Sequence, residues 1–132
     1  MTTALDQAQI LMQANEFPEA FAICRSVAYD TNATTNDRAD AFQMLGTIVQ
    51  CTPTLGDTDE CGLSYFKRAL EIDPEHLWAC LGIVTTFGKN FPDHQDVAAV
   101  KSALEKLLLR IDDVPASSRK TIADRSKLLE TF

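Results

Sequence analysis

Few residues in this sequence have the type and spacing that chemistry requires. The acidic run Asp57-Thr-Asp59-Glu-Cys61-Gly begins like a calcium-binding loop, in which carboxylate oxygens hold the ion. The ligand set then fails, because Cys61 stands where an oxygen ligand is needed and Arg68 stands where the final bidentate Glu is needed. We therefore interpret Asp57 and Glu60 as a capping pair for a helix, and we expect no metal ion.

The histidines and cysteines form no catalytic pattern. His76 and His94 are expected on the exposed first turns of two helices, and neither has a second ligand at a spacing typical of zinc. No Cys-x-x-Cys pair occurs among the four cysteines, which stand at positions 24, 51, 61 and 80. Gly-x-Ser-x-Gly motifs and glycine-rich phosphate loops are absent from the sequence. The sequence thus predicts no catalytic residue, no cofactor and no enzymatic activity.

The charge of the chain argues against several classes of partner. The net charge is −7, and it is uneven: residues 1–75 hold 12 acidic and 4 basic side chains, whereas residues 76–132 hold 7 and 8. A nucleic-acid partner is not expected, because phosphates are met by clustered Lys and Arg. The amino terminus lacks the pattern of a signal peptide, and the longest nearly apolar run, LWACLGIVTTF, is too short to cross a bilayer. We expect a cytoplasmic protein with no membrane partner.

Helical patterns dominate the elements that must position these side chains. Apolar residues recur at helical spacing, and no segment alternates apolar and polar residues as a strand does. We expect helices over residues 3–14, 18–29, 37–51, 58–72, 74–87, 93–111 and 116–131. Thr3 with Asp6 predicts a cap for the first helix, and Asp73 with Pro74 predicts the start of the fifth. The fold class is therefore predicted to be all-α.

A spacing repeats along these helices. Residues 42–49 and 78–85 both read aromatic-x-x-Leu-Gly, and a weaker version surrounds Ala8. The small residues Ala8, Gly46 and Gly82 stand 38 and 36 positions apart. Small side chains at these positions allow two helices to approach closely.

In this pattern the sequence resembles the tetratricopeptide repeat (TPR) family. The middle unit matches the family at Phe42, Leu45, Gly46, Val49, Gly62, Phe66, Ala69 and Pro74. The resemblance implies antiparallel helix hairpins in a right-handed superhelix, with Phe42, Phe66 and Trp78 in the core. It implies one domain over residues 1–132, with repeat units at about 3–30, 36–73 and 74–111 and a capping helix at about 116–131. That helix shows Ile122, Leu129 and Phe132 opposite the bases Arg119, Lys120, Arg125 and Lys127.

The first helix of each hairpin is expected to line a concave groove. The residues turned away from the packing stripe form three rows, namely Leu5, Gln9 and Met12; Gln43, Thr47 and Gln50; and Ala79, Ile83 and Thr86. None of them is charged, so the groove does not match the acidic chaperone tails that some family members bind through basic residues. The rows predict a groove that binds a peptide or a segment of another protein, or a second copy of the chain.

The function hypothesis is a non-enzymatic protein–protein interaction module. Two alternatives are open from the sequence. One is a small acidic chaperone for a secreted substrate, and the other is the accessory TPR domain of a larger enzyme such as a transferase.

Overall fold

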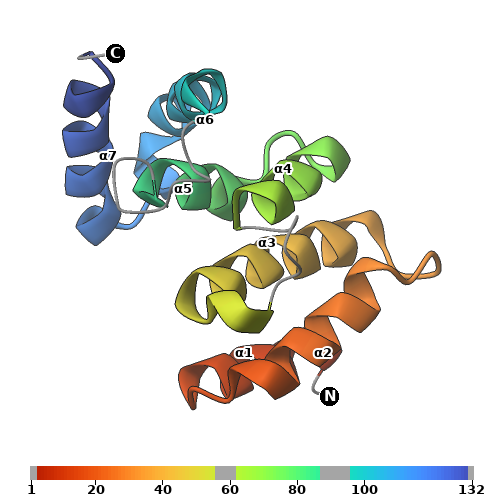
Figure 1. Ribbon diagram of the computed structural model, residues 1–132. Helices are drawn as coiled ribbons and strands as arrows, with labels where there is room; N and C mark the ends of the chain where they lie inside the picture. Colours follow the sequence, from red (N-terminus) through yellow and green to blue (C-terminus); the bar gives the residue numbers. More distant parts are fainter. Residues whose placement is uncertain (1–2, 56–61, 87–95, 131–132) are drawn as a thin grey trace. The chain divides into compact units, whose positions relative to one another are not determined.

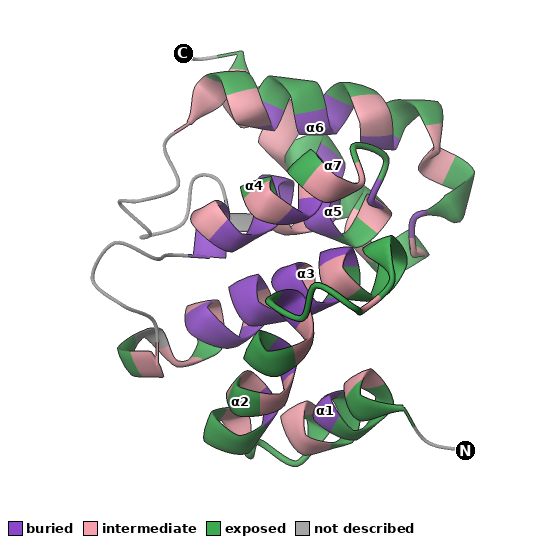
Figure 2. Ribbon diagram, turned by 90° about the vertical axis from the view of Figure 1, so that its right-hand side faces the viewer, coloured by how far each residue is buried: buried purple, intermediate pink, exposed green. Residues whose placement is uncertain are grey.

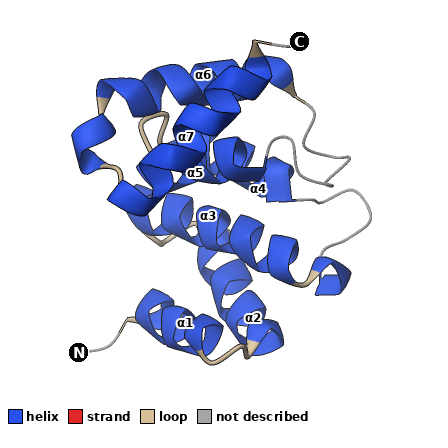
Figure 3. Ribbon diagram, turned by 90° about the vertical axis from the view of Figure 1, so that its left-hand side faces the viewer, coloured by secondary structure: helices blue, strands red, loops and turns tan. Residues whose placement is uncertain are grey.

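All regular structure in the chain is helical wherever the structure describes it. The computed structural model describes residues 3–55, 62–86 and 96–130, and no strand occurs in these ranges (Figure 3). The prediction of an all-α fold is confirmed. Backbone contacts divide the chain into two compact units, residues 1–74 and 75–132. The division falls one residue from the expected boundary between the second and third repeat units.

The first unit is built around its third helix. The unit contains α1 (Ala4–Gln13), α2 (Phe17–Ala28), α3 (Thr35–Cys51), the 3-10 turn η1 (Pro53–Leu55) and α4 (Gly62–Ile72) (Figure 1). Neighbouring helices pack in sequence order, α1 on α2, α2 on α3 and α3 on α4, and α1 also touches α3. Figure 2 shows α3 as a largely buried helix, because it has a neighbour on most of its faces.

The start of α1 is the reciprocal cap that the sequence predicts. The Thr3 hydroxyl oxygen accepts a hydrogen bond from the Asp6 N–H at 3.1 Å, and the Thr3 N–H donates to the Asp6 carboxylate at 3.2 Å. The start of α3 uses one half of this arrangement, with the Thr34 hydroxyl accepting from the Asp37 N–H at 3.1 Å. Both caps satisfy backbone N–H groups that the first turn of a helix leaves without a partner.

The turn between α1 and α2 depends on one residue of unusual backbone conformation. Asn15 has a φ of 62°, in the left-handed region that Asn tolerates better than most residues. This conformation allows the Glu16 N–H to donate to the Leu11 carbonyl at 2.8 Å and the Asn15 N–H to donate to the Met12 carbonyl at 3.1 Å. The pair of bonds is a Schellman motif, and it reverses the chain within three residues.

The closest approach between helices in this unit joins α3 to α4. A β-carbon built on Gly46 would lie 2.7 Å from Cε1 of Phe66, and one built on Gly62 would lie 2.8 Å from Cγ of Gln50. Glycine at both positions therefore lets the two helices approach until the Phe66 ring covers Gly46. The prediction that a small residue at Gly46 allows close packing is confirmed.

One end of the unit is held by an arginine among aromatic rings. The Arg68 guanidinium donates to the Tyr29 hydroxyl and lies 5.9 Å from the ring centroids of both Phe42 and Tyr65. The rings of Tyr29 and Phe42 meet edge to face at 5.5 Å. Cation–π and aromatic pairs of this kind add stabilisation beyond the burial of apolar area. They connect α2, α3 and α4 at one site.

The described residues of the second unit form three α-helices. These residues contain α5 (Leu77–Thr86), α6 (Val97–Leu109), the 3-10 turn η2 (Ile111–Asp113) and α7 (Ala116–Leu129). α5 packs against α6, and α7 contacts both. The buried side chains include Val84, Val100, Leu104, Leu107 and Ile122. No helix among the described residues is long and apolar enough to cross a bilayer.

The start of α5 differs from the prediction. Asp73 still belongs to the end of α4, because its N–H donates to the Ala69 carbonyl at 2.8 Å, and Pro74 lies in the turn that follows. His76 caps the helix instead, with Nδ1 accepting a hydrogen bond from the Ala79 N–H at 3.1 Å. The expectation that His76 is exposed is therefore wrong, since the ring folds over the helix start and is buried.

Two large apolar side chains, Trp78 and Leu108, are exposed, and Trp78 was expected in the core. Trp78 is 49% exposed, because α5 buries the neighbouring positions Ala79 and Cys80 and directs Trp78 away from them. Leu108 is 56% exposed, although it continues the apolar stripe of α6. The stripe is wider than the contact that α6 makes, so its outer edge meets solvent.

Several predicted features lie outside the described residues. They are the capping pair Asp57 and Glu60, Cys61, the expected helix end at residue 87, the expected helix start at residue 93 with His94, and Phe132.

Replacement of Gly46 by Ala tests the contact between α3 and α4. Gly→Ala inside a helix normally raises the free energy of unfolding by about 1 kcal/mol. Here the new methyl group meets Phe66, so we expect the free energy of unfolding to fall by about 1–3 kcal/mol. Denaturation followed by circular dichroism measures it, because the single Trp lies in the other unit. In a Phe66→Leu background the same change should cost less, and an equal cost in both backgrounds contradicts the ring contact.

Replacement of Ile122 by Ala tests whether α7 closes the core of the second unit. Ile122 is the one buried apolar side chain that α7 contributes among its described residues, with 2% exposed. Its truncation should lower the free energy of unfolding by about 2–5 kcal/mol. Denaturation monitored by Trp78 fluorescence measures this change. Leu109→Ala is the control, because Leu109 is 87% exposed and its loss should change stability by less than about 0.5 kcal/mol. Equal small effects of both changes would mean that α7 does not complete the core.

Candidate functional site

The predicted row on α3 passes through the middle of the helix, where most other residues are buried. Between Ala41 and Val49 every residue is buried except Gln43 and Thr47. The Gln43 side-chain N–H donates to the Thr47 hydroxyl oxygen at 3.1 Å. The Thr47 hydroxyl in turn donates to the backbone carbonyl oxygen of Gln43 at 3.3 Å. The two side chains are therefore held in place by each other. Gln43 keeps its amide oxygen and one N–H for other partners.

Gln50, the third member of this row, belongs to the contact between α3 and α4. Its Cγ is the atom that a β-carbon on Gly62 would meet. Its Nε2 is buried and has no hydrogen-bond partner among the described residues. A buried amide without a partner lowers stability by about 1–3 kcal/mol. Gln50 is therefore packed against α4, and fewer of its polar atoms are available to a ligand than the sequence predicts.

The predicted row on α1 lies at the surface of the first unit. Gln9 is exposed, and Leu5 and Met12 are half-buried on either side of it along the helix. α1 contacts α3, so the rows on these two helices belong to neighbouring elements. They contain apolar and amide side chains and no charge.

The row expected on α5 is not a surface. Ala79 and Ile83 have 0% and 1% of their area exposed, so the prediction that they face a partner is wrong. The segment Leu77–Thr86 is apolar on nearly every side, and a helix of this kind is buried most of the way around. The side chain of Thr86 lies outside the described residues.

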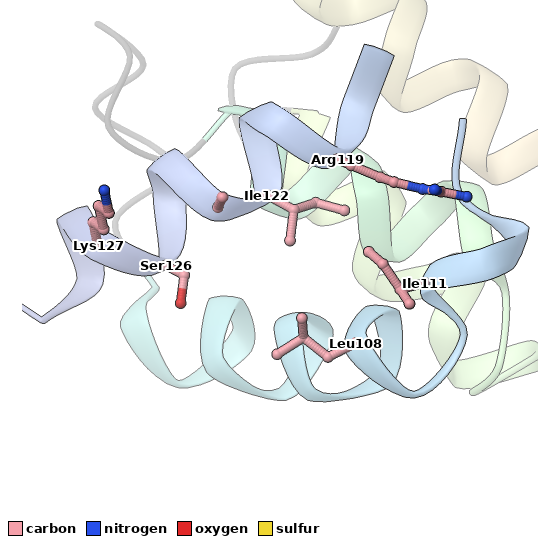
Figure 4. Close-up of a pocket in the computed structure, with 7 residues that line it drawn as sticks. Leu108, Ile111, Arg119, Ile122, Ser126 and Lys127 are labelled. Carbon is pink, nitrogen blue, oxygen red and sulfur yellow. The ribbon is translucent and has the colours of Figure 1, made fainter. Parts of the chain in front are cut away.

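A pocket that the sequence did not predict lies between α6, η2 and α7. Its volume is about 410 Å³. Figure 4 shows Ile122 of α7 and Leu108 of α6 pointing toward each other across it. The lining residues are mostly apolar at their exposed atoms, and they are Leu108, Ile111, Arg119, Ile122, Ala123, Ser126 and Lys127.

Two cations stand at the ends of this pocket. Arg119 and Lys127 are eight residues apart on α7, and Figure 4 shows them on opposite sides of Ile122. Arg119 is fixed by its own hydrogen bonds, since Nε donates to the Val114 carbonyl at 3.1 Å and NH2 donates to the Asp112 carbonyl at 3.4 Å. No carboxylate is among the lining residues. The pocket thus has an apolar floor and a positive rim.

The sequence contained a signal for this pocket. Helical spacing predicts that the bases of α7 lie opposite its apolar residues. Positions 119, 122, 123, 126 and 127 follow the spacing of one broad helix face, however, so the helix offers Arg119 and Ile122 to the same pocket. The second signal was the apolar stripe on α6, which is wider than the contact of one neighbouring helix can cover.

The described residues contain no group of three or more His, Cys, Asp or Glu side chains placed to hold a metal ion. Cys24 and Cys80 are buried free thiols, and Cys51 is an exposed one. Burial raises the pKa of the Cys24 thiol to about 12.

Comparisons with known proteins assign no relative to this chain. A scan against protein-family models, a search of curated proteins and a search of solved structures each found no match. The proposals below therefore depend on the geometry and on the sequence pattern.

Labelling of the thiols tests the burial of Cys24. At pH 8 a thiol with a pKa of about 12 is ionised in only about one molecule in 10⁴, and the thiolate is the reactive form. We expect iodoacetamide to modify Cys51 at least about 100-fold faster than Cys24, as measured by peptide mapping in a mass spectrometer. Under denaturing conditions the two should react at similar rates. Rapid labelling of Cys24 in the folded chain would contradict its burial.

Proposed function

We propose that the chain is a non-enzymatic interaction module that binds a peptide or an extended protein segment on the surface formed by α1 and α3. The proposal depends in part on the resemblance of the sequence to TPR proteins. In those proteins the first helices of successive hairpins form the binding face. The order of helix contacts in the first unit supports it, since hairpins α1–α2 and α3–α4 pack through α2 on α3, with α1 touching α3.

One observation carries the proposal. Between Ala41 and Val49, α3 is accessible only along Gln43 and Thr47, so the middle of the central helix presents a polar and uncharged face. A charged solvent-facing stripe is the usual outcome for the outer side of a helix, because Lys and Glu keep such a face hydrated. An uncharged face can lose its water to a ligand without leaving a charge buried and unpaired.

The hydrogen bond between Gln43 and Thr47 prepares this face for binding. Both side chains are already ordered in the absence of a ligand, so less conformational entropy is lost on association. The amide oxygen of Gln43 and its remaining N–H can pair with the N–H and C=O groups of an extended peptide. Leu5 and Met12 on α1 supply apolar area for the peptide's side chains. The expected ligand is therefore a peptide without a strong net charge.

The experiment uses peptides selected from a random displayed library against the whole chain. Peptides that bind the proposed surface should lose affinity by about tenfold or more for the Gln9→Glu variant. The reason is that a carboxylate desolvated without a counterion costs over about 1.4 kcal/mol. Isothermal titration calorimetry measures the dissociation constants.

Gln7→Glu is the matched control. Gln7 and Gln9 are both exposed amides on α1, but two positions along a helix turn the side chain by about 200°. The Gln7→Glu variant should bind within about twofold of the wild type, and neither change should alter folding noticeably. If both variants bind the selected peptides as the wild type does, the surface of α1 and α3 is not the binding face.

A further inference from the structure

The pocket between α6 and α7 has a chemistry that the proposed function does not use. It lies in the second unit, whereas α1 and α3 lie in the first, so the two surfaces are separate sites. Its floor exposes apolar atoms in an otherwise acidic protein. Leu108 is 56% exposed, and Ile111 and Ala123 line the pocket with it. Large apolar side chains grouped at one surface site are typical of a binding surface.

The charges around the floor have a definite arrangement. Residues 1–75 hold 12 acidic and 4 basic side chains, but α7 carries four bases and one acid between Ala116 and Leu129. Two of these bases, Arg119 and Lys127, line the pocket, and within the described part of the chain Lys127 forms no ion pair. Attraction across an interface requires potentials of opposite sign. The occupant must therefore carry negative charge beside apolar groups.

The separation of the two cations distinguishes one kind of occupant from others. Eight residues of α-helix span about 12 Å, so a ligand with a single anionic head meets only one cation at a time. A partner helix that lies along α7 can contact both cations if it carries two acidic residues about seven positions apart. Apolar residues three and four positions after the first acidic residue lie on the same face of that helix. These positions share one face of a helix, which would place the apolar residues over Leu108 and Ile122. A groove between two helices is also the shape that receives an amphipathic helix.

We propose that the pocket formed by α6, η2 and α7 binds an acidic amphipathic helix of a partner protein. Its apolar residues lie between Leu108 and Ile122, and its two acidic residues pair with Arg119 and Lys127. Arg119 is preorganised for this role, because its bonds to the carbonyls of Val114 and Asp112 hold the guanidinium at the edge of the pocket.

The probe is a synthetic helical peptide of about 16 residues with acidic and apolar residues at these spacings. Its binding to the full chain is measured by fluorescence anisotropy. We expect saturable binding that weakens at least about tenfold for Leu108→Ala and for Lys127→Glu. A peptide of the same composition with scrambled order should bind at least about tenfold more weakly, because it has no continuous apolar face.

Two matched variants control for general effects. Leu109→Ala removes an exposed Leu next to Leu108 that does not line the pocket, and Lys120→Glu makes the same charge change on α7 outside the lining. Both should bind the probe within about twofold of the wild type. A probe with Lys in place of one of its two acidic residues should bind the Lys127→Glu variant more tightly than it binds the wild type, and this rescue identifies the paired position. Circular dichroism verifies that each variant is folded.

Other occupants give different results, and each would overturn the proposal. A second copy of the chain predicts self-association in sedimentation equilibrium that Leu108→Ala abolishes, with no binding of the probe. An anionic lipid surface predicts sedimentation with phosphatidylserine vesicles that Lys127→Glu abolishes, again with no binding of the probe. Absence of saturable probe binding below about 1 mM, or equal weakening by the control variants, would also overturn it. None of these results bears on the surface of α1 and α3, which is tested with different peptides and variants.

Discussion

The approach of Gly46 to Gly62 is the constraint on which the first unit depends. Neither position has room for a β-carbon, so α3 and α4 pack with their backbones close together and the Phe66 ring lies directly on α3. α2 encloses a second side of α3, and Arg68 joins α2, α3 and α4 at one end. What stays accessible on α3 is the part that none of these contacts covers. The proposed binding row is thus a result of how the central helix is enclosed, and the trapped amide of Gln50 is a second result of the same close packing.

Features that depend on residues close in sequence were predictable. Thr3 and Asp6 are three positions apart, and their capping bonds form between neighbours that any helix start brings together. The closeness of α3 to α4 was also predictable, since Gly46 is a small residue among the large apolar side chains of Met44, Leu45 and Ile48. The cap of α5 was missed, because Asp73 and Pro74 match a helix start as well as His76 does. Only the backbone hydrogen bond from Asp73 to Ala69, which ties Asp73 to the end of α4, decides between them.

Features that depend on the rotation of a helix against its neighbours were not predictable. α5 is apolar on nearly all sides, so its sequence contains no information about which face meets solvent, and the rows expected from the spacing of α3 did not transfer to it. The exposed face of α6 was equally hard to predict. Its apolar stripe is broad, and the contact with neighbouring helices covers only part of the stripe. The pocket depends on the second effect, because the contact between α6 and α7 buries Ile122 and leaves Leu108 open.

The order in which helices contact each other has a consequence for local stability. α1 buries only Ala8 completely, and α2 is its main neighbour, whereas α3 buries eight residues and contacts α1, α2 and α4. A helix with few buried side chains unfolds locally at a smaller free-energy cost. The amide protons of α1 should therefore exchange with solvent before those of α3. A ligand that bridges the two helices would slow that exchange, and part of its binding free energy would be spent on keeping α1 folded.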